Sequence, residues 1–150
     1  MSASYYLMKA HNIDAWRGDD THIATKDMYV IVSDEQFRMF KITLKAGYRC
    51  DGLSIPWAFR WFLSKWDEKN YLYSVAGAVH DALYTTGGWY GLFCREQCDD
   101  IFRSLLREAG ISRFKAGAAD KAVEWFAGGD AHWRNDSFKN KNFIVVTEER

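Results

Sequence analysis

The stretch GAVHDALY at residues 77–84 lies in a proline-free run, residues 71–84, in which apolar residues recur at helical spacing. This periodicity predicts a helix with an apolar stripe toward the core. His80 and Tyr84 are one turn apart and share a row beside that stripe, while Gly77, one turn earlier, leaves room to approach the imidazole. One helix therefore carries a proton-transfer group (His80), a carboxylate (Asp81) and a phenol (Tyr84).

A second helix is predicted over residues 94–109, because apolar residues recur there as Cys94, Cys98, Ile101 and Leu105. Asp99 sits beside this row, so we expect its carboxylate at the margin of the interior, where it needs a partner. Two partners are available: Arg95, one turn earlier on the same helix, and His80 on the preceding helix.

Asp100 points in a different direction from Asp99. It aligns with Arg103 and Arg107 on its own helix. Pairs three or four residues apart on a helix surface form readily, so we expect Asp100 to make solvated ion pairs.

Two interpretations of His80 stay open. A single histidine beside an apolar stripe is often a structural residue with a satisfied hydrogen bond. Alternatively, a carboxylate that fixes one ring nitrogen prepares the other to take a proton from water. On this second interpretation the candidate catalytic residues are His80, Asp99 and Tyr84, with Arg95 in support.

Strand-forming patterns occur at both ends of the chain. Residues 28–32 and the alternating residues 37–44 predict a hairpin around the turn Ser33–Gln36, and residues 4–9 predict a further short strand. Residues 143–147 (FIVVT) have strand composition and could add an edge to the hairpin. The polar residues 11–25 predict a surface loop.

The remaining residues are mostly helical by their pattern. Helices are predicted over residues 57–66, where Pro56 suits a first helical position and Ser54 can cap, and over residues 113–127. The fold expected is α+β: an N-terminal β-hairpin or small antiparallel sheet packed on a mostly helical half. In that half, an antiparallel helix pair carries His80 and Asp99.

Length and charge narrow the function classes. The 150 residues suit one domain, residues 1–150. Twenty basic and twenty acidic residues cancel, which gives no support for a nucleic-acid partner. No apolar run is long enough to cross a bilayer, and three cysteines without framework spacing favour a reducing compartment, the cytoplasm. A zinc site at Cys50, Cys94 and Cys98 with a histidine is an alternative use of the cysteines.

Three signatures occur in order: DGLSIP at 51–56, HDALY at 80–84, and Arg95 with Asp99 and Phe102 on the next helix. This order resembles a family of uncharacterised domains found largely in tailed bacteriophages and prophages, marked by DGxSIP, HDxLY and RxxxDxxF. The resemblance covers about residues 28–133. It implies a phage or prophage source and a location in the host cytoplasm or in the virion.

The same constellation is more distantly similar to the secretory phospholipase A2 fold. That similarity implies that His80 is the general base, that Asp99 orients it, and that Asp81 is a ligand of Ca²⁺. It further implies that the loop of residues 50–54, with Asp51 and Gly52, supplies the remaining calcium oxygens. Such a site would act on a lipid or a small ester.

Two functional hypotheses follow. The first is a calcium-dependent ester or phospholipid hydrolase that uses His80 and Asp99. The second is a noncatalytic virion, tail-assembly or host-interaction protein of a phage, in which the same side chains form a polar network that specifies the helix pair.

Overall fold

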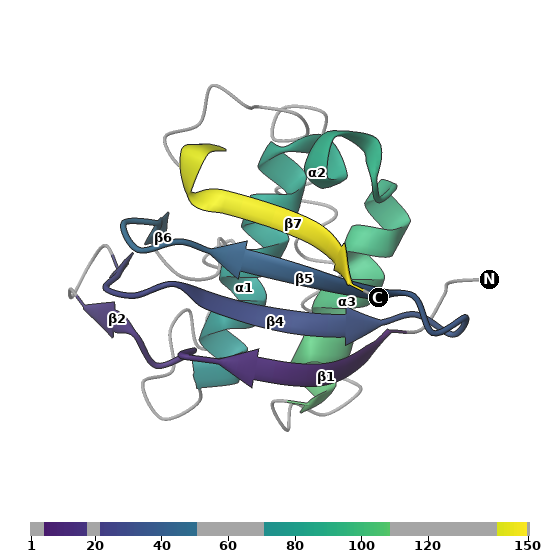
Figure 1. Cartoon of the computed structure of the whole chain (residues 1–150), viewed down its shortest axis with the longest axis horizontal. Helices are drawn as coiled ribbons and strands as arrows, with labels where there is room; N and C mark the ends of the chain where they lie inside the picture. The colour runs from purple at the N-terminus through teal and green to yellow at the C-terminus, as the bar shows by residue number, and fades with distance from the viewer. Residues whose placement is uncertain (1–4, 18–21, 51–70, 109–140, 150) are drawn as a thin grey trace, which may run out of the picture.

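A computed structural model describes residues 5–17, 22–50, 71–108 and 141–149 of the chain. Within these residues the main element is a four-stranded antiparallel sheet (Figure 1). Its strands, in spatial order, are β1 (Tyr6–His11), β4 (Met28–Ser33), β5 (Met39–Leu44) and β7 (Ile144–Glu149). The structure confirms the predicted hairpin and the C-terminal strand, which pairs with β5 and becomes one edge of the sheet.

The alternation of residue types along β4 and β5 decides which face of this sheet is buried. Because successive strand residues point to opposite faces, every second side chain is on the inner face. These inner side chains are Met28, Val30, Val32, Phe40, Ile42 and Leu44, and each is at most 5% exposed. They form the sheet side of the hydrophobic core.

A second, three-stranded sheet was not predicted. It consists of β2 (Trp16–Arg17), β3 (His22–Ala24) and β6 (Arg49–Cys50), in the order β2-β3-β6. The prediction of a surface loop over residues 11–25 is therefore wrong: Ala24 is buried, and its N–H donates to the carbonyl of Tyr48 at 2.9 Å. Strands of two or three residues are too short to show a period in the sequence. They form because segments that are separated in the sequence pair with each other.

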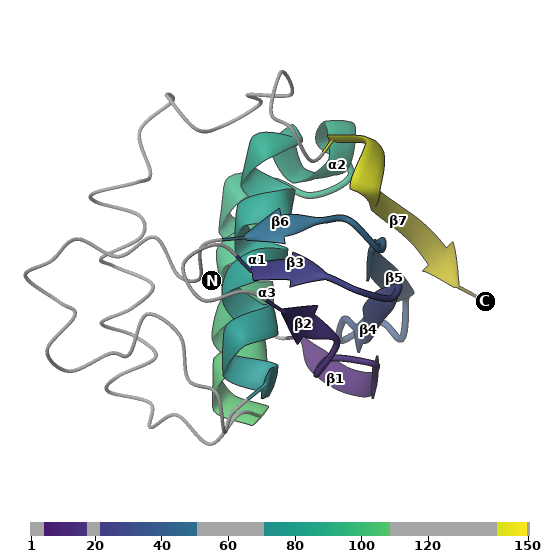
Figure 2. The same ribbon diagram turned by 90° about the vertical axis from the view of Figure 1, so that its left-hand side faces the viewer.

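Helices α1 (Tyr71–Thr85) and α3 (Arg95–Glu108) lie side by side and cover one face of the large sheet (Figures 1 and 2). This arrangement confirms the predicted α+β fold with its helix pair. Helix α1 is buried more completely than its apolar stripe suggests: from Val75 to Thr85 only Asp81 is partly exposed. A helix enclosed in this way must satisfy its polar side chains within the protein.

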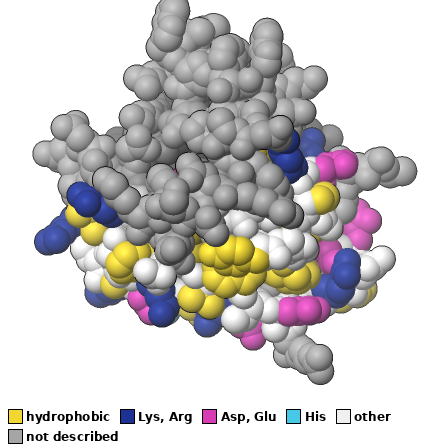
Figure 3. All heavy atoms as spheres, turned by 90° about the horizontal axis from the view of Figure 1, so that it is seen from above, with side chains coloured by type: hydrophobic (Ala, Val, Ile, Leu, Met, Phe, Trp, Pro, Cys, Tyr) yellow, Lys and Arg dark blue, Asp and Glu magenta, His cyan; other side chains and the backbone are white. Residues whose placement is uncertain are grey.

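The short element α2 (Gly87–Gly91) joins the two helices where an aromatic loop was expected. Its residues have left-handed φ angles, including 55° at Trp89 and 56° at Tyr90. The turn is closed by Thr86, whose hydroxyl accepts a bond from the Trp89 N–H at 3.0 Å. Seen from above, hydrophobic side chains gather in the middle of the face on which α2 and β7 lie (Figure 3).

The predicted helices at residues 57–66 and 113–127 lie outside the described residues. Among the helices that the structure does describe, none combines the length and the apolar character that crossing a membrane requires.

Candidate functional site

His80 and Asp99 meet between the two long helices. Nε2 of His80 lies 3.0 Å from Oδ1 of Asp99, within hydrogen-bond distance. His80 is 6% exposed and Asp99 is 9% exposed. The structure therefore contains the predicted contact between Asp99 and His80, which lies 19 residues earlier in the chain.

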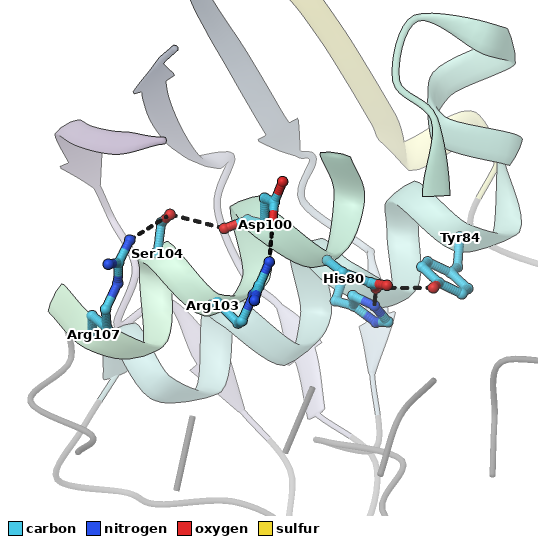
Figure 4. A network of polar contacts seen from close by, with 7 residues as sticks. His80, Tyr84, Asp100, Arg103, Ser104 and Arg107 are labelled. Atoms are coloured by element: carbon cyan, nitrogen blue, oxygen red, sulfur yellow. Dashed lines mark hydrogen bonds and ion pairs between the residues drawn. The ribbon is translucent and has the colours of Figure 1, made fainter. Parts of the chain in front are cut away.

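Tyr84 completes this group. Its hydroxyl donates to the same oxygen, Oδ1 of Asp99, at 2.9 Å. Burial raises the pKa of Tyr84, and the negative charge and the hydrogen bond of Asp99 raise it further, against an opposing effect of Arg95. The phenol therefore stays protonated at neutral pH and acts as a donor. Figure 4 shows His80 and Tyr84 turned toward this shared acceptor.

Packing fixes the plane of the imidazole. The ring centre of His80 lies 4.3 Å from that of Tyr84 and 4.8 Å from that of Phe102. A neutral histidine that bonds a carboxylate through Nε2 carries its proton there, so Nδ1 keeps the lone pair. Within the described part of the chain, no hydrogen bond to Nδ1 is found. This nitrogen is the one that chemistry could use.

Arg95 lies next to this group on the first turn of α3. Its guanidinium carbon is 5.9 Å from the ring centre of Tyr84, and its side-chain hydrogen bond lowers the pKa of that phenol. Arg95 therefore contacts Tyr84, the side chain that shares Oδ1 of Asp99 with His80.

The prediction for Asp100 was right about its partner and wrong about its exposure. It pairs with Arg103, as its spacing predicts, but the carboxylate is only 3% exposed, which is less than Asp99. Ser104 and Arg107 extend this second network along α3 (Figure 4). Among the described residues, Oδ2 of Asp100 has no hydrogen-bond partner. The helix is enclosed on more sides than its apolar row indicates, so the Asp100 carboxylate of this ion pair is buried, whereas the Arg103 side chain is 34% exposed.

Asp81 follows His80 but faces another element. Consecutive helix residues are about 100° apart, and Oδ2 of Asp81 lies 3.4 Å from the hydroxyl of Tyr48, which also bonds the carbonyl of Ala78 at 3.2 Å. Tyr48 is fully buried and directly precedes β6. Sequence patterns gave no sign of Tyr48 at this site, because the contact spans more than thirty residues.

The remaining predicted site residues belong to the loop at residues 50–54. Asp51, Gly52 and Ser54 lie outside the described residues. Strand β6 ends at Cys50, so the chain enters the Asp51–Gly52 segment from the strand next to Tyr48. In the described part of the chain, no three His, Cys, Asp or Glu side chains cluster as metal ligands would.

The sequence was compared with models of known protein families. A family model described as "Protein of unknown function (DUF1353)" matches residues 26–123. The chain belongs to the DUF1353 family. The match includes β4, β5, both long helices and the His80–Asp99 pair, whereas the edge strands β1 and β7 lie outside it. Neither the curated proteins nor the solved structures gave a significant match.

Proposed function

We propose that this DUF1353 protein is a hydrolase that cleaves an ester, with His80 as general base and Asp99 as the residue that orients it. The observation that carries the proposal is the shared carboxylate oxygen. It accepts bonds from Nε2 of His80 and from the hydroxyl of Tyr84, and so fixes both the tautomer and the ring plane. Nδ1 is then the basic atom.

The reaction follows from these roles. Nδ1 of His80 takes a proton from a water molecule as the water oxygen attacks the ester carbonyl. The imidazolium that forms is stabilised by the Asp99 carboxylate, as in other oriented histidine bases. The proton then passes from Nδ1 to the alcohol that leaves. Tyr84 holds Asp99 in place and takes no proton, because its raised pKa keeps it protonated.

A calcium ion is part of this proposal. Its ligands would be Asp81 together with Asp51 and Gly52. Carboxylate and carbonyl oxygens are the donors that calcium prefers, and the Asp81 carboxylate contacts Tyr48, which directly precedes the strand that leads into residues 51–52. When bound, the ion would polarise the ester carbonyl and stabilise the negative charge that develops there. A lipid or a small ester would be the substrate.

The test is hydrolysis by the purified protein of p-nitrophenyl esters and of phospholipid in mixed micelles. Each substrate is measured with millimolar calcium and with a chelator. We expect turnover that falls at least about a hundredfold in His80→Asn and Asp99→Asn. Glu96→Gln changes an exposed side chain in the first turn of α3, the helix that carries Asp99. This control should leave turnover unchanged. Turnover that is equal in His80→Asn and the parent would refute the proposal.

A second candidate is favoured by a different observation, the near-complete burial of His80 and Asp99. In this candidate the protein is a noncatalytic phage component, and the network of His80, Asp99 and Tyr84 specifies how the two helices pack. Stoichiometric copies in purified virions, together with a large loss of stability but no loss of assembly function in His80→Asn, would support it. Absence from the particles would count against a virion role.

A further inference from the structure

The outer face of the four-stranded sheet is the face that the helices leave open. Helices α1 and α3 lie against the inner face, and no described helix or strand lies over the other one (Figures 1 and 2). Alternate side chains of β4 and β5 point to this outer face and are partly exposed, in contrast to the buried inner set. These outer side chains are Tyr29, Ile31, Met39, Lys41 and Thr43.

The ring of Tyr29 gathers three side chains on this face. His11, its partner on the neighbouring strand β1, stacks on it with the ring centres 5.0 Å apart and the planes at 26°. Nζ of Lys41 lies 4.2 Å from the centre of the Tyr29 ring, and Nζ of Lys9 lies 5.9 Å from it. The outer face therefore carries a stacked aromatic pair flanked by two ammonium groups.

The two ammonium groups converge although their strands do not pair with each other. Lys9 on β1 and Lys41 on β5 are both opposite Ile31 of β4, so their Cα atoms are about 10 Å apart. Both side chains nevertheless turn toward one ring. The ring face attracts each cation, but the N–H groups of each ammonium remain available to an acceptor. Because the two like charges repel each other, an anion that contacts both would be stabilised there.

Carboxylates do not neutralise this pair of charges within the described part of the chain. The ion pairs found there include neither Lys9 nor Lys41. Acidic side chains stand at the margins: Glu149 ends β7, and Asp27 precedes β4, where its Oδ1 accepts a bond from the N–H of Ala46. The whole chain is neutral, but exposed charges act over about 10 Å, so this part of the sheet is locally basic.

We propose that the outer sheet face binds single-stranded nucleic acid. An unpaired base extends the stack of His11 and Tyr29, and phosphates of the same strand contact Lys9 and Lys41. Aromatic rings beside basic side chains are the means by which proteins hold single strands, and a four-stranded sheet is one surface that presents them. The site is independent of His80.

The stacked rings distinguish this ligand from other anions. The side chain of His11 is exposed, so a further flat ring has access to the stack. An unpaired base gains from such stacking, whereas a carboxylate of an acidic peptide and a lipid head group have no ring to stack. In a duplex the faces of the bases are covered by their neighbours, so a duplex would contact the lysines alone.

The first test measures the charge contribution. A fluorescein-labelled oligothymidine of about 20 nucleotides is titrated with the full chain at about 50 mM sodium chloride and at higher salt, and its anisotropy is recorded. We expect saturable binding that weakens as the salt rises. Lys9→Gln and Lys41→Gln should each weaken it at least about threefold and reduce the salt slope by about 0.7. Arg107→Gln removes the same charge from an exposed position on α3 and should change binding less than about twofold.

The second test measures the stacking contribution. His11→Ala removes the exposed ring and should weaken oligothymidine binding at least about fivefold. His11→Phe keeps a ring and should bind within about twofold of the parent. Because His11 is exposed on an edge strand, we expect both variants to keep the melting temperature of the parent within about 2 °C.

Five outcomes would overturn the proposal. The first is no oligothymidine binding by the parent at low salt, and the second is binding that the lysine variants do not weaken. The third is an equal loss in His11→Phe and His11→Ala. The fourth is equal affinity for a duplex, or displacement by polyglutamate as effective as by unlabelled oligothymidine, because charge alone would then explain the binding. The fifth is lysine-dependent flotation with phosphatidylglycerol vesicles without oligothymidine binding, which would assign this face to a membrane.

Discussion

Oδ1 of Asp99 accepts hydrogen bonds from two side chains of the facing helix, and Nε2 of His80 is one of them, at 3.0 Å. This bond joins α1 to α3 inside the protein and sets the tautomer of the imidazole. The hydrolase proposal and the structural-network alternative both start from this contact. The first predicts a loss of turnover when the contact is removed, and the second predicts a loss of stability only.

Asp99→Asn tests the bond directly. The amide keeps the size of the carboxylate but loses its charge, so we expect the free energy of unfolding to fall by about 1.5–3 kcal/mol. Urea denaturation of the parent and the variant measures this change. Nitrogen NMR of the neutral imidazole should show the proton on Nε2 in the parent. A proton on Nδ1 instead would contradict the assigned role of Asp99.

Tyr84→Phe removes one donor to Asp99 and keeps the ring that packs on His80. We expect a loss of about 1 kcal/mol at neutral pH. The pKa of Tyr84 is raised in the folded state, so its contribution is complete below the ordinary tyrosine pKa of about 10 and is lost as the pH rises above that value. The stability difference between parent and variant should therefore shrink in alkali, which denaturation at pH 7 and at pH 11 would measure.

Gly88→Ala should disturb the connection between α1 and α3. A Cβ atom at Gly88 would lie 2.0 Å from the carbonyl oxygen of Phe93, and its φ is +69°. Gly91 is a matched control, because its φ is also positive, at +95°, but a Cβ atom there meets nothing within 4 Å. We expect thermal unfolding to show a loss of about 1 kcal/mol for Gly91→Ala and about 3 kcal/mol for Gly88→Ala. Equal losses would mean that the predicted clash is absent.

Asp34→Asn should change how stability depends on pH. Burial opposes ionisation of Asp34, but bonds from the backbone and side chain of Arg38 and from the backbone of Gln36 outweigh it and lower the pKa. A lowered pKa stabilises the folded state above the ordinary aspartate value of about 4, and this contribution is lost as the pH falls below it. The parent should be more stable than Asp34→Asn at pH 7, and the difference should narrow at pH 3. A constant difference would show that the carboxylate charge is not involved.

The thiols should differ in reactivity. Cys98 is fully buried, and burial raises its pKa, with further contributions from Asp99 and Cys94. Cys94 is exposed. In a Cys50→Ser background at pH 8, one thiol per chain should react rapidly with a disulfide reagent, and the second should react only after unfolding in urea. Rapid reaction of Cys98 in the folded protein would mean that the core opens there.

Local patterns predicted several features correctly. Alternation along residues 37–44 predicted the hairpin, although Phe37 belongs to the turn and β5 starts at Met39. The composition of residues 143–147 predicted the last strand, and the position of Asp99 beside the apolar row predicted a carboxylate at the interior margin. Periods of two and 3.6 residues determine which side chains share a face, and that information is present in the sequence.

Other features were decided by contacts between distant segments. The small sheet exists because residues 16–17 pair with residues 23–24 and residues 22–23 pair with residues 49–50, and Tyr48 reaches Asp81 across the core. Asp100 is buried although its spacing suggests a solvated ion pair. The sequence by itself determined the β4–β5 hairpin, the C-terminal strand and the helix pair. Only the tertiary structure decided which buried polar groups meet, because burial and hydrogen bonding depend on neighbours that no local period specifies.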